Sequence, residues 1–326
     1  MTGLYDAWQR QINYLRVSVT DHCNMNCIYC TAGSVPHLPR SEILSYEEIH
    51  KVVQVAASMG INKVRLTGGE PLLRPDLSKL VQMLSQIKGI DDISLTTNGI
   101  LLVKYAVELK KAGLNRVNIS LDTLRADRFE RITSLGRLDE VLSGIDAAYR
   151  AGLQPVKINM VVMRGINDDE IIDFARMSQN QGWNVRFIEF MPLGAAKNEI
   201  LKTVPTREIR QRIGTLGKLE PYTGKTGNGP ARYYRLPGAK GTIGFISPMT
   251  EHFCNTCNRL RLTADGHLRP CLLNDEESDL KEALRNNSGT DELLQLIQQA
   301  VATKRERHHL NEGITLKKRP MRQIGG

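Results

Sequence analysis

Six short apolar segments recur along the first 190 residues, and each is followed by a stretch of helical character. The segments have the length and composition of strands and lie at 14–20, 63–67, 93–97, 116–121, 156–162 and 185–190. Between the first two, Ser45 and Glu48 form a capping-box pattern, and Gly60 marks the end of the predicted helix. Such alternation is typical of a parallel sheet with right-handed crossovers. It predicts an α/β fold, either a barrel that closes most of the way or a doubly wound open sheet.

The alternation is expected to end at Pro192, which places a domain boundary near residue 193. The predicted organisation is an N-terminal segment, 1–13, then a partial barrel, 14–192, and a C-terminal domain, 193–326. In either sheet architecture the ligand lies at the carboxyl ends of the strands. The stretches at 21–30 and 67–71 follow strands and are rich in thiols, glycine and polar residues. We therefore expect the functional site there.

The six cysteines of the chain fall into two sets of three, and none is left over. The first set, spaced C-x3-C-x2-C, is Cys23, Cys27 and Cys30, and the second, spaced C-x2-C-x13-C, is Cys254, Cys257 and Cys271. Odd sets argue against disulfides and favour metal binding. Three thiolates suit a four-iron cluster, because one iron then stays open for a substrate or cofactor. A closed zinc site needs a fourth ligand, which His22, His252 or His267 could supply, so spacing alone leaves zinc open.

The gap of thirteen residues in the second set has a physical explanation. Asp265-Gly266 is a strong signal for a two-residue hairpin turn between 260–263 and 267–271. Pairing across such a turn puts Cys271 opposite Leu260. The hairpin would thus fold the third ligand back toward the other two.

The basic charge of the chain is mostly local. The formal net charge is +9, and residues 303–326 contribute seven Lys or Arg against two acidic residues. Aromatic residues make up 5% of the chain and are absent from that stretch, which disfavours nucleic acid and favours a small phosphorylated ligand. The sequence has no apolar run long enough for a membrane span and no signal peptide. We expect a soluble, cytoplasmic protein without a membrane partner.

Two motifs together carry a resemblance to a known superfamily. The first cysteine set with Tyr29 before Cys30, followed by Thr-Gly-Gly-Glu-Pro at 67–71, resembles the radical S-adenosylmethionine enzymes. Within that superfamily, 14–21, 254–262 and the terminal Gly325-Gly326 are similar to the GTP 3′,8-cyclase family. The resemblance runs from Tyr14 to the last residue. Thr31-Ala32-Gly33 departs from the apolar residue and proline usual in the family, which concerns the shape of the loop and not the ligands.

The resemblance implies a fold and a reaction. The fold would be an incomplete (β/α)6 TIM-type barrel with a C-terminal extension that carries a second 4Fe–4S cluster. The first cluster would bind S-adenosylmethionine and deliver one electron, which yields a 5′-deoxyadenosyl radical. That radical would take hydrogen from C3′ of GTP, after which C3′ bonds to C8 of guanine, and the second cluster would bind the guanine base. The implied partners are a flavodoxin-like or ferredoxin-like electron donor, a second copy of the chain, and cyclic pyranopterin monophosphate synthase as the next enzyme.

Site residues follow from the resemblance position by position. The residues matching S-adenosylmethionine contacts are Tyr29, Gly69, Ser120 and Met191. Those matching GTP contacts are Arg16, Arg65, Thr96, Lys157, Arg259, Leu260 and Arg261. Arg259, Arg261, Gly325 and Gly326 are also expected to serve catalysis, the glycines as a tail that reaches the site. Arginine suits phosphate because its planar fork donates in pairs, and Gly69 would let backbone approach the ligand closely.

Two other functions are compatible with parts of the pattern. A peptide-modifying radical S-adenosylmethionine enzyme with an auxiliary cluster would keep both cysteine sets, but it would not need the arginines or the double-glycine tail. A zinc-dependent nucleic-acid-binding protein would use both sets structurally. It would have no use for the glycine-rich loop at 67–71.

Overall fold

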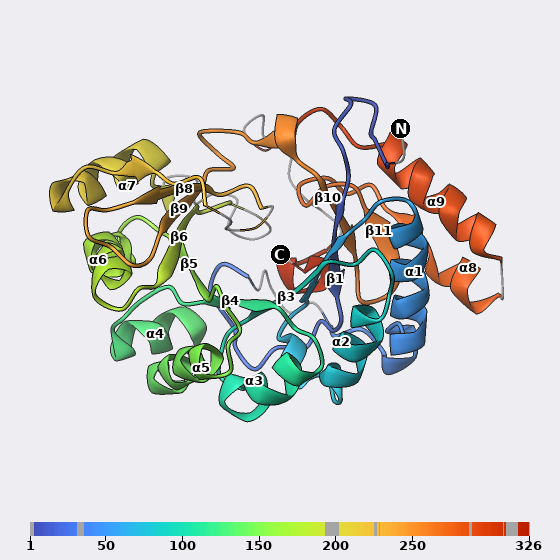
Figure 1. Cartoon of the computed structure of the whole chain (residues 1–326), viewed down its shortest axis with the longest axis horizontal. Coiled ribbons are helices and arrows are strands. Elements are labelled where there is room, and N and C mark those ends of the chain that lie inside the picture. Colours follow the sequence, from blue (N-terminus) through green and yellow to red (C-terminus); the bar gives the residue numbers. More distant parts are fainter. Residues whose placement is uncertain are drawn as a thin grey trace.

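The computed structural model describes residues 3–30, 36–192, 202–224, 227, 229–286, 289–308, 310 and 319–325. Their strands form one curved sheet, with helices on its outer side (Figure 1). The strands are β1 (Tyr14–Ser18), β2 (Lys63–Thr67), β3 (Asp92–Thr97), β4 (Arg116–Ser120), β5 (Lys157–Val162), β6 (Asn184–Glu189), β7 (Glu220–Pro221), β8 (Arg232–Arg235), β9 (Ile243–Ile246), β10 (Arg259–Leu262), β11 (His267–Arg269) and β12 (Ser278–Asp279). Their order in the sheet is β12-β11-β10-β1-β2-β3-β4-β5-β6-β9-β8-β7.

The helices lie mostly between successive strands of the sheet. They are α1 (Tyr46–Ser58), α2 (Leu77–Ser85), α3 (Leu102–Lys111), α4 (Ala126–Thr133), α5 (Leu138–Arg150), α6 (Ile171–Asn180), α7 (Thr206–Ile213), α8 (Lys281–Arg285), α9 (Thr290–Ala302) and α10 (Met321–Ile324). The predicted capping box is confirmed at α1, where Ser45 Oγ accepts from the Glu48 amide at 3.1 Å and Glu48 accepts from the Ser45 amide at 2.6 Å. Among the described helices, none is long and apolar enough to cross a membrane.

The order of the first six strands decides between the two predicted architectures. Strands β1 to β6 pair in parallel in chain order, each with the next. A doubly wound sheet would reverse its order at a switch point, and a barrel does not. The incomplete (β/α)6 barrel is therefore confirmed.

Strand pairing extends beyond these six strands at both edges. After β6 the chain forms α7 and then β9, which pairs in parallel with β6. At the other edge β10 pairs in parallel with β1. The prediction that the alternation ends at Pro192 is therefore wrong. The low apolar content of 206–213 had concealed α7, which buries only one narrow face. The domain boundary near residue 193 stays a prediction.

The two faces of the barrel strands differ in chemistry. The outward residues are apolar and pack under the helices, as with Leu15 and Val17 on β1. The residues between them face inward and are polar on strand after strand. They are Arg16, Arg65, Ser94, Asn118, Asn159 and Arg186. Hydrogen bonds between side chains of neighbouring strands, such as Arg65 to Ser94 at 3.1 Å, support this placement. The inside of the arc is thus a polar chamber.

The hairpin between β10 and β11 exists, but its register differs from the prediction. Arg261 pairs with Arg269 and Leu262 with Leu268, and the Thr263 amide bonds to the His267 carbonyl. The turn therefore has three residues, with Gly266 at φ +86° in its last position. The same register places Cys271 level with Arg259, one residue from the predicted Leu260. The third cysteine still returns to the first two.

Candidate active site

The first cysteine set lies in the loop that follows β1. The Cys30 amide donates to the Cys27 carbonyl at 2.9 Å, and the Met25 amide donates to the Cys23 thiol at 3.4 Å. Burial raises the pKa of all three thiols, to about 11 for Cys30, and Asp122 adds to the effect at Cys27. The surroundings of this set therefore disfavour free thiolates.

The second set lies beside cationic side chains. Cys254 and Cys257 are joined by a short turn, in which the Cys257 amide donates to the Cys254 carbonyl at 3.1 Å. Burial opposes ionisation of Cys257, but Arg259 and Lys304 outweigh it and lower its pKa to about 6. Arg259 donates to the Cys257 thiol at 3.7 Å. At Cys257 the protein therefore favours a thiolate, the form that binds metals, whereas burial raises the pKa of Cys254.

The spacing of the thiols decides against single zinc ions. The thiolates of a tetrahedral zinc site with ~2.3 Å bonds lie ~3.8 Å apart. Across the described ranges, only Asp21, His22 and His37 bring three potential ligand atoms within 4.8 Å of one another. The thiols of each set nevertheless influence one another electrostatically, so they are neighbours that are not all in contact. This is compatible with a cluster in which each cysteine holds a different iron.

The histidines that could have completed zinc sites in the second set have other partners. The rings of His252 and His308 lie 3.1 Å apart, measured from Nδ1 to Nε2. His267 Nδ1 lies 3.4 Å from an Asp265 oxygen. Neither arrangement directs a ring nitrogen to the cysteines as a fourth ligand.

The residues expected to contact S-adenosylmethionine lie at the carboxyl ends of the barrel strands. Ser120 ends β4, and Met191 follows β6 and packs near Ile324. The Tyr29 hydroxyl donates to Asp122 at 2.7 Å. A Cβ on Gly69 would lie 2.2 Å from the His22 carbonyl oxygen, so in this structure the close approach that requires glycine is to the cluster loop. Their contacts with the cofactor stay predictions.

Two buried carboxylates border the first cysteine set, and the sequence prediction gave neither a role. Glu70 accepts from the Leu72 amide, the Thr97 hydroxyl and the Asn98 amide at 2.7 to 3.0 Å. Burial nevertheless raises its pKa to about 7. Burial likewise raises the pKa of Asp122 to about 6. Glu70 joins the ends of β2 and β3 and thereby fixes the floor of the site.

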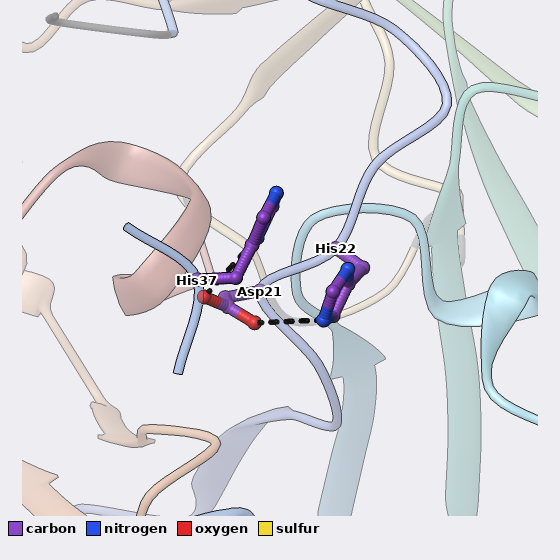
Figure 2. Close-up of side chains that lie close together, drawn as sticks. All are labelled: Asp21, His22 and His37. Atoms are coloured by element: carbon purple, nitrogen blue, oxygen red, sulfur yellow. Dashed lines mark ion pairs between the residues drawn. The ribbon is translucent and has the colours of Figure 1, made fainter. Parts of the chain in front are cut away.

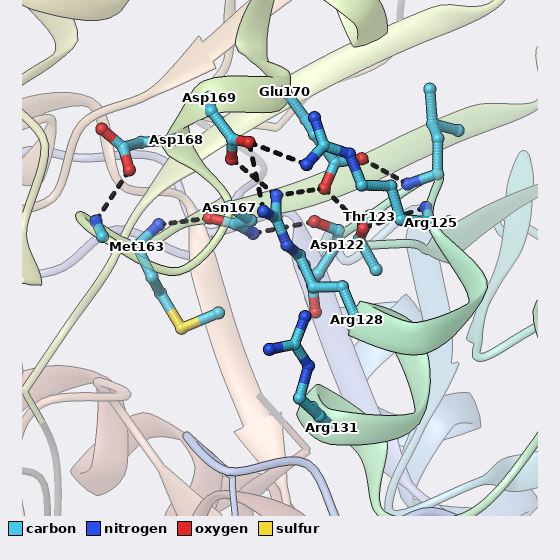
Figure 3. A network of polar contacts seen from close by, with 12 residues as sticks. Asp122, Thr123, Arg125, Arg128, Arg131, Met163, Asn167, Asp168, Asp169 and Glu170 are labelled. Carbon is cyan, nitrogen blue, oxygen red and sulfur yellow. Dashed lines mark hydrogen bonds and ion pairs between the residues drawn. The ribbon is translucent and has the colours of Figure 1, made fainter.

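A polar network holds Asp122 in place (Figure 3). Asn167 donates to the Asp122 carbonyl at 2.8 Å and accepts from the Met163 amide at 2.7 Å. Glu170 accepts from the Thr123 hydroxyl and from Arg128, both at 2.5 Å. The end of β4 is thereby tied to the loop after β5, and the Asp122 carboxylate is free to receive Tyr29.

A row of arginines crosses the inner face of the sheet. Arg261 on β10, Arg16 on β1 and Arg65 on β2 occupy the same register position. Burial and the Arg261 charge lower the pKa of Arg16, and burial and Arg259 lower that of Arg261 to about 9. Guanidinium groups buried in register repel one another, and an acceptor or an anion between them relieves that repulsion. Binding of an anion at this row stays a prediction.

The far side of the chamber adds further basic side chains. Burial lowers the pKa of Lys157 to about 6, and Arg186 and Arg116 contribute to the shift. Arg186 donates to Asn159 and to Asn118, both at 2.7 Å. The sequence prediction missed Arg186 and Asn118. The polar-apolar alternation within β4 and β6 was the signal that could have found them.

Two of the expected GTP residues have distinct surroundings. Thr96 Oγ1 is buried and has no hydrogen-bond partner among the described residues, so it can serve a ligand. The Leu260 side chain is 1% exposed and packs in the core on the outer face of β10. Any contact of Leu260 with GTP would therefore come from its backbone.

The C-terminal tail enters the chamber, and α10 lies inside the arc of strands (Figure 1). The Gly325 carbonyl accepts from Arg261 at 2.7 Å and from Arg16 at 3.2 Å. Gly325 has φ +71°, and a Cβ there would lie 2.7 Å from Thr67 Cγ2. The Arg322 backbone forms a hydrogen bond to the Cys30 thiol. The tail thus touches both the arginine row and the first cysteine set. Gly326 lies outside the described residues.

Comparison with known proteins agrees with this arrangement. Residues 17–178 match the Radical SAM superfamily, and residues 183–310 match Molybdenum Cofactor Synthesis C. The chain is 52% identical to GTP 3′,8-cyclase of Pelotomaculum thermopropionicum, over 99% of this chain and 100% of the relative. It is 51% identical to the enzyme of the same name from Moorella thermoacetica, with the same coverage.

The chain belongs to the GTP 3′,8-cyclase family. Members of this family use a radical S-adenosylmethionine 4Fe–4S cluster and carry a second 4Fe–4S cluster. Streptococcus suis SuiB bound to its precursor peptide SuiA has the same fold, with a TM-score of 0.64 and 16% identity over 97% of this chain and 75% of SuiB.

The charges of the cyclase chamber are segregated between the two cysteine sets. The carboxylates Glu70 and Asp122 act on the first set at Cys23 and Cys27, where the cation Arg322 opposes them in part, whereas Arg259 and Lys304 act on Cys257. S-adenosylmethionine carries a sulfonium cation, and GTP carries a polyanion. The distribution of charge therefore matches a cationic cofactor at the first set and an anionic substrate at the second.

Proposed function

We propose that the protein converts GTP to (8S)-3′,8-cyclo-7,8-dihydro-GTP, the first step of molybdenum cofactor (molybdopterin) biosynthesis. The observation that carries this proposal is the register of Arg261, Arg16 and Arg65 inside the barrel, between the two cysteine sets. A peptide substrate would not need three buried cations in a row. A triphosphate does, because its oxygens accept paired hydrogen bonds from guanidinium groups.

The cysteines would hold the two clusters. Cys23, Cys27 and Cys30 fit the first 4Fe–4S cluster, and Cys254, Cys257 and Cys271 fit the second. When bound, the first cluster with S-adenosylmethionine supplies a carbon radical strong enough to take hydrogen from C3′ of GTP. Tyr29, Gly69, Ser120 and Met191 would position the cofactor at the carboxyl ends of the strands.

The other residues of the chamber would orient GTP. The triphosphate would be held by Arg16, Arg65, Lys157 and Arg186. The Thr96 hydroxyl would form a hydrogen bond with the nucleoside, as donor or as acceptor. Arg259 and Arg261 alternate on β10 and would bind the part of GTP nearest the second cluster. Arg261 and Arg16 donate to the Gly325 carbonyl and would also donate to the substrate. The positions of GTP and of the tail would therefore depend on one another.

The proposal extends to the cellular setting. One electron per turnover would come from a flavodoxin-like or ferredoxin-like donor, and the enzyme would act as a homodimer in the cytoplasm. The product would pass to cyclic pyranopterin monophosphate synthase. The boundary near residue 193 would separate the half that generates the radical from the half that binds the base.

The test uses the enzyme with both clusters, incubated anaerobically with S-adenosylmethionine, dithionite and GTP deuterated at C3′. Mass spectrometry follows the label into 5′-deoxyadenosine. Label transfer with consumption of GTP is the expected result. 5′-Deoxyadenosine without label would reject C3′ of GTP as the position attacked and would favour a different substrate, such as a peptide.

A further inference from the structure

Three potential metal ligands meet just beyond β1, outside both cysteine sets. Asp21 is fully buried, and His22 and His37 each approach a different oxygen of its carboxylate (Figure 2). His37 Nδ1 lies 3.5 Å from one carboxylate oxygen, and His22 Nε2 lies 3.9 Å from the other. The three ligand atoms lie within 4.8 Å of one another.

The Asp21 carboxylate lacks part of its hydrogen bonding. One oxygen accepts from the Leu38 amide at 2.8 Å. The other, Oδ1, is buried and has no hydrogen-bond partner within the described part of the chain. Burying a carboxylate without full pairing is unfavourable, so a cation is expected beside it. Either a protonated imidazole or a bound metal ion would supply that charge.

The backbone around the cluster of ligands is already fixed. The His22 amide donates to Thr20 Oγ1 at 3.1 Å, and the His22 carbonyl accepts from the Glu70 amide at 2.7 Å. Asp21 itself holds the other side through Leu38. Only the two half-exposed rings are free to turn, with 52% and 43% of the His22 and His37 side chains exposed. The carbon framework is thus preorganised, and the ring nitrogens are accessible.

We propose that Asp21, His22 and His37 bind one divalent transition-metal ion such as Zn²⁺. Two imidazoles and one carboxylate form a ligand set that such ions favour, with water in the remaining positions. The rings are stacked, with centroids 4.1 Å apart and planes 8° apart. A metal lies near the plane of each imidazole that binds it, so one ring turns on binding and the stack opens.

The position of this site in the chain gives it a consequence. Residues 22 and 37 bracket the segment that contains Cys23, Cys27 and Cys30. A metal ion joining both ends closes this loop and reduces its freedom. Metal binding should therefore slow hydrogen exchange at Leu38, whose amide already bonds to Asp21.

The experiment measures Zn²⁺ binding to the anaerobic enzyme with both clusters in place, in competition with a coloured zinc chelator. We expect one Zn²⁺ per chain, and X-ray absorption at the zinc edge should find nitrogen and oxygen ligands without sulfur. His22→Gln and His37→Gln should each weaken binding by at least about tenfold, because second-shell partners alone typically account for 10–100-fold. His50→Gln, on α1, is the matched control and should bind as the wild type does.

Three results would overturn the proposal. Zn²⁺ could bind His37→Gln as tightly as the wild type, or sulfur could appear among its ligands, which would mean that it had replaced cluster iron. Absence of binding at tenfold excess of Zn²⁺ would leave only a histidine-carboxylate ion pair. Iron content and cluster absorbance equal to wild type in each variant establish that the loop is intact.

Discussion

The two cysteine sets have the same number of thiols and differ most at Cys257, whose pKa is lowered, whereas burial raises the pKa of Cys254 as it does those of the first set. At the first set, burial and Asp122 raise the pKa of Cys27, and Glu70 acts in the same direction on Cys23. At the second, Arg259 and Lys304 lower the pKa of Cys257 to about 6 in spite of burial. The sequence spacing of the sets does not reveal this difference, since charges after β2 and β4, on β10 and after α9 produce it.

The difference teaches that one chamber can hold two similar clusters for dissimilar tasks. Carboxylates near the first set favour a ligand with positive charge, and guanidinium groups near the second favour a polyanion. The Gly325 tail lies between the two regions, with its carbonyl on Arg261 and the Arg322 backbone on Cys30. The arrangement predicts that substitutions in the two regions impair different steps of the reaction.

Loss of one thiol from each set should give the largest and most separable effects. Cys27→Ser should abolish 5′-deoxyadenosine formation, whereas Cys257→Ser should retain it and lose GTP cyclisation. Each loss should exceed about 100-fold, since even the outer partners of metal ligands account for 10–100-fold. Quantifying 5′-deoxyadenosine and cyclised product in parallel distinguishes the two variants. Equal failure of both reactions in both variants would remove the division of tasks.

Removing a charge from the arginine row should harm the substrate side alone. Arg261→Ala should lower kcat/KM for GTP by roughly 10- to 150-fold, because hydrogen bonds to charged groups contribute about 1.5–3 kcal/mol. S-adenosylmethionine binding should be unchanged. Arg232→Ala, on the exposed β8, is the matched control. An equal loss of cofactor affinity in Arg261→Ala would contradict the segregation of charge.

Much of this comparison was accessible from the sequence, and its limits are physical. The strand segments and the helix cap at Ser45 follow from local patterns, and the structure confirms them. The two ligand sets of cysteines also follow from local spacing and stay a prediction. The partnership of Asp122 with Tyr29 joins residues 93 apart, and no local pattern encodes it. The parallel pairing of β10 with β1 likewise joins segments far apart in the sequence, so no local pattern predicts it.

Arg186 shows the other kind of limit. It lies on β6 between Val185 and Phe187, whose side chains are buried in the core. Strands buried on both faces are usually apolar throughout, so a single arginine in such a strand is easily taken for an isolated exception without a function. Only the repetition of inward polar residues on β1, β2 and β4 makes it part of a site.

Arg319, which precedes α10 in the C-terminal tail, offers a test with a smaller expected effect. Arg319 pairs with Asp265 at 2.9 Å and with Glu277 at 2.8 Å, and it is 12% exposed. Arg319→Ala should release the tail and lower the rate of cyclisation about tenfold, because it breaks partly buried ion pairs. Formation of 5′-deoxyadenosine should persist. Arg319→Lys should restore part of the activity, and failure of both variants in both reactions would indicate general unfolding instead of a tail effect.

The smallest expected effect is a proton taken up when GTP binds. In the free protein, burial and neighbouring arginines lower the pKa of Lys157 to about 6, so this amine is mostly neutral at pH 8. A bound triphosphate raises the pKa of a nearby amine, since the opposite charge favours its protonated form. Binding at pH 8 should therefore take up as much as about one proton, and binding at pH 5 should take up almost none from this residue.

Calorimetry in buffers of different ionisation enthalpy measures this uptake directly. Lys157→Met is the decisive variant, because it keeps the length of the side chain and removes the titrating group. The triphosphate of GTP is already deprotonated at pH 8, and the cations around it favour that form, so it neither releases nor takes up a proton on binding. If the variant takes up as many protons as the wild type, the proton goes to another group, and the cationic side of the chamber does not depend on Lys157. If uptake disappears, Lys157 acquires its charge only with the substrate.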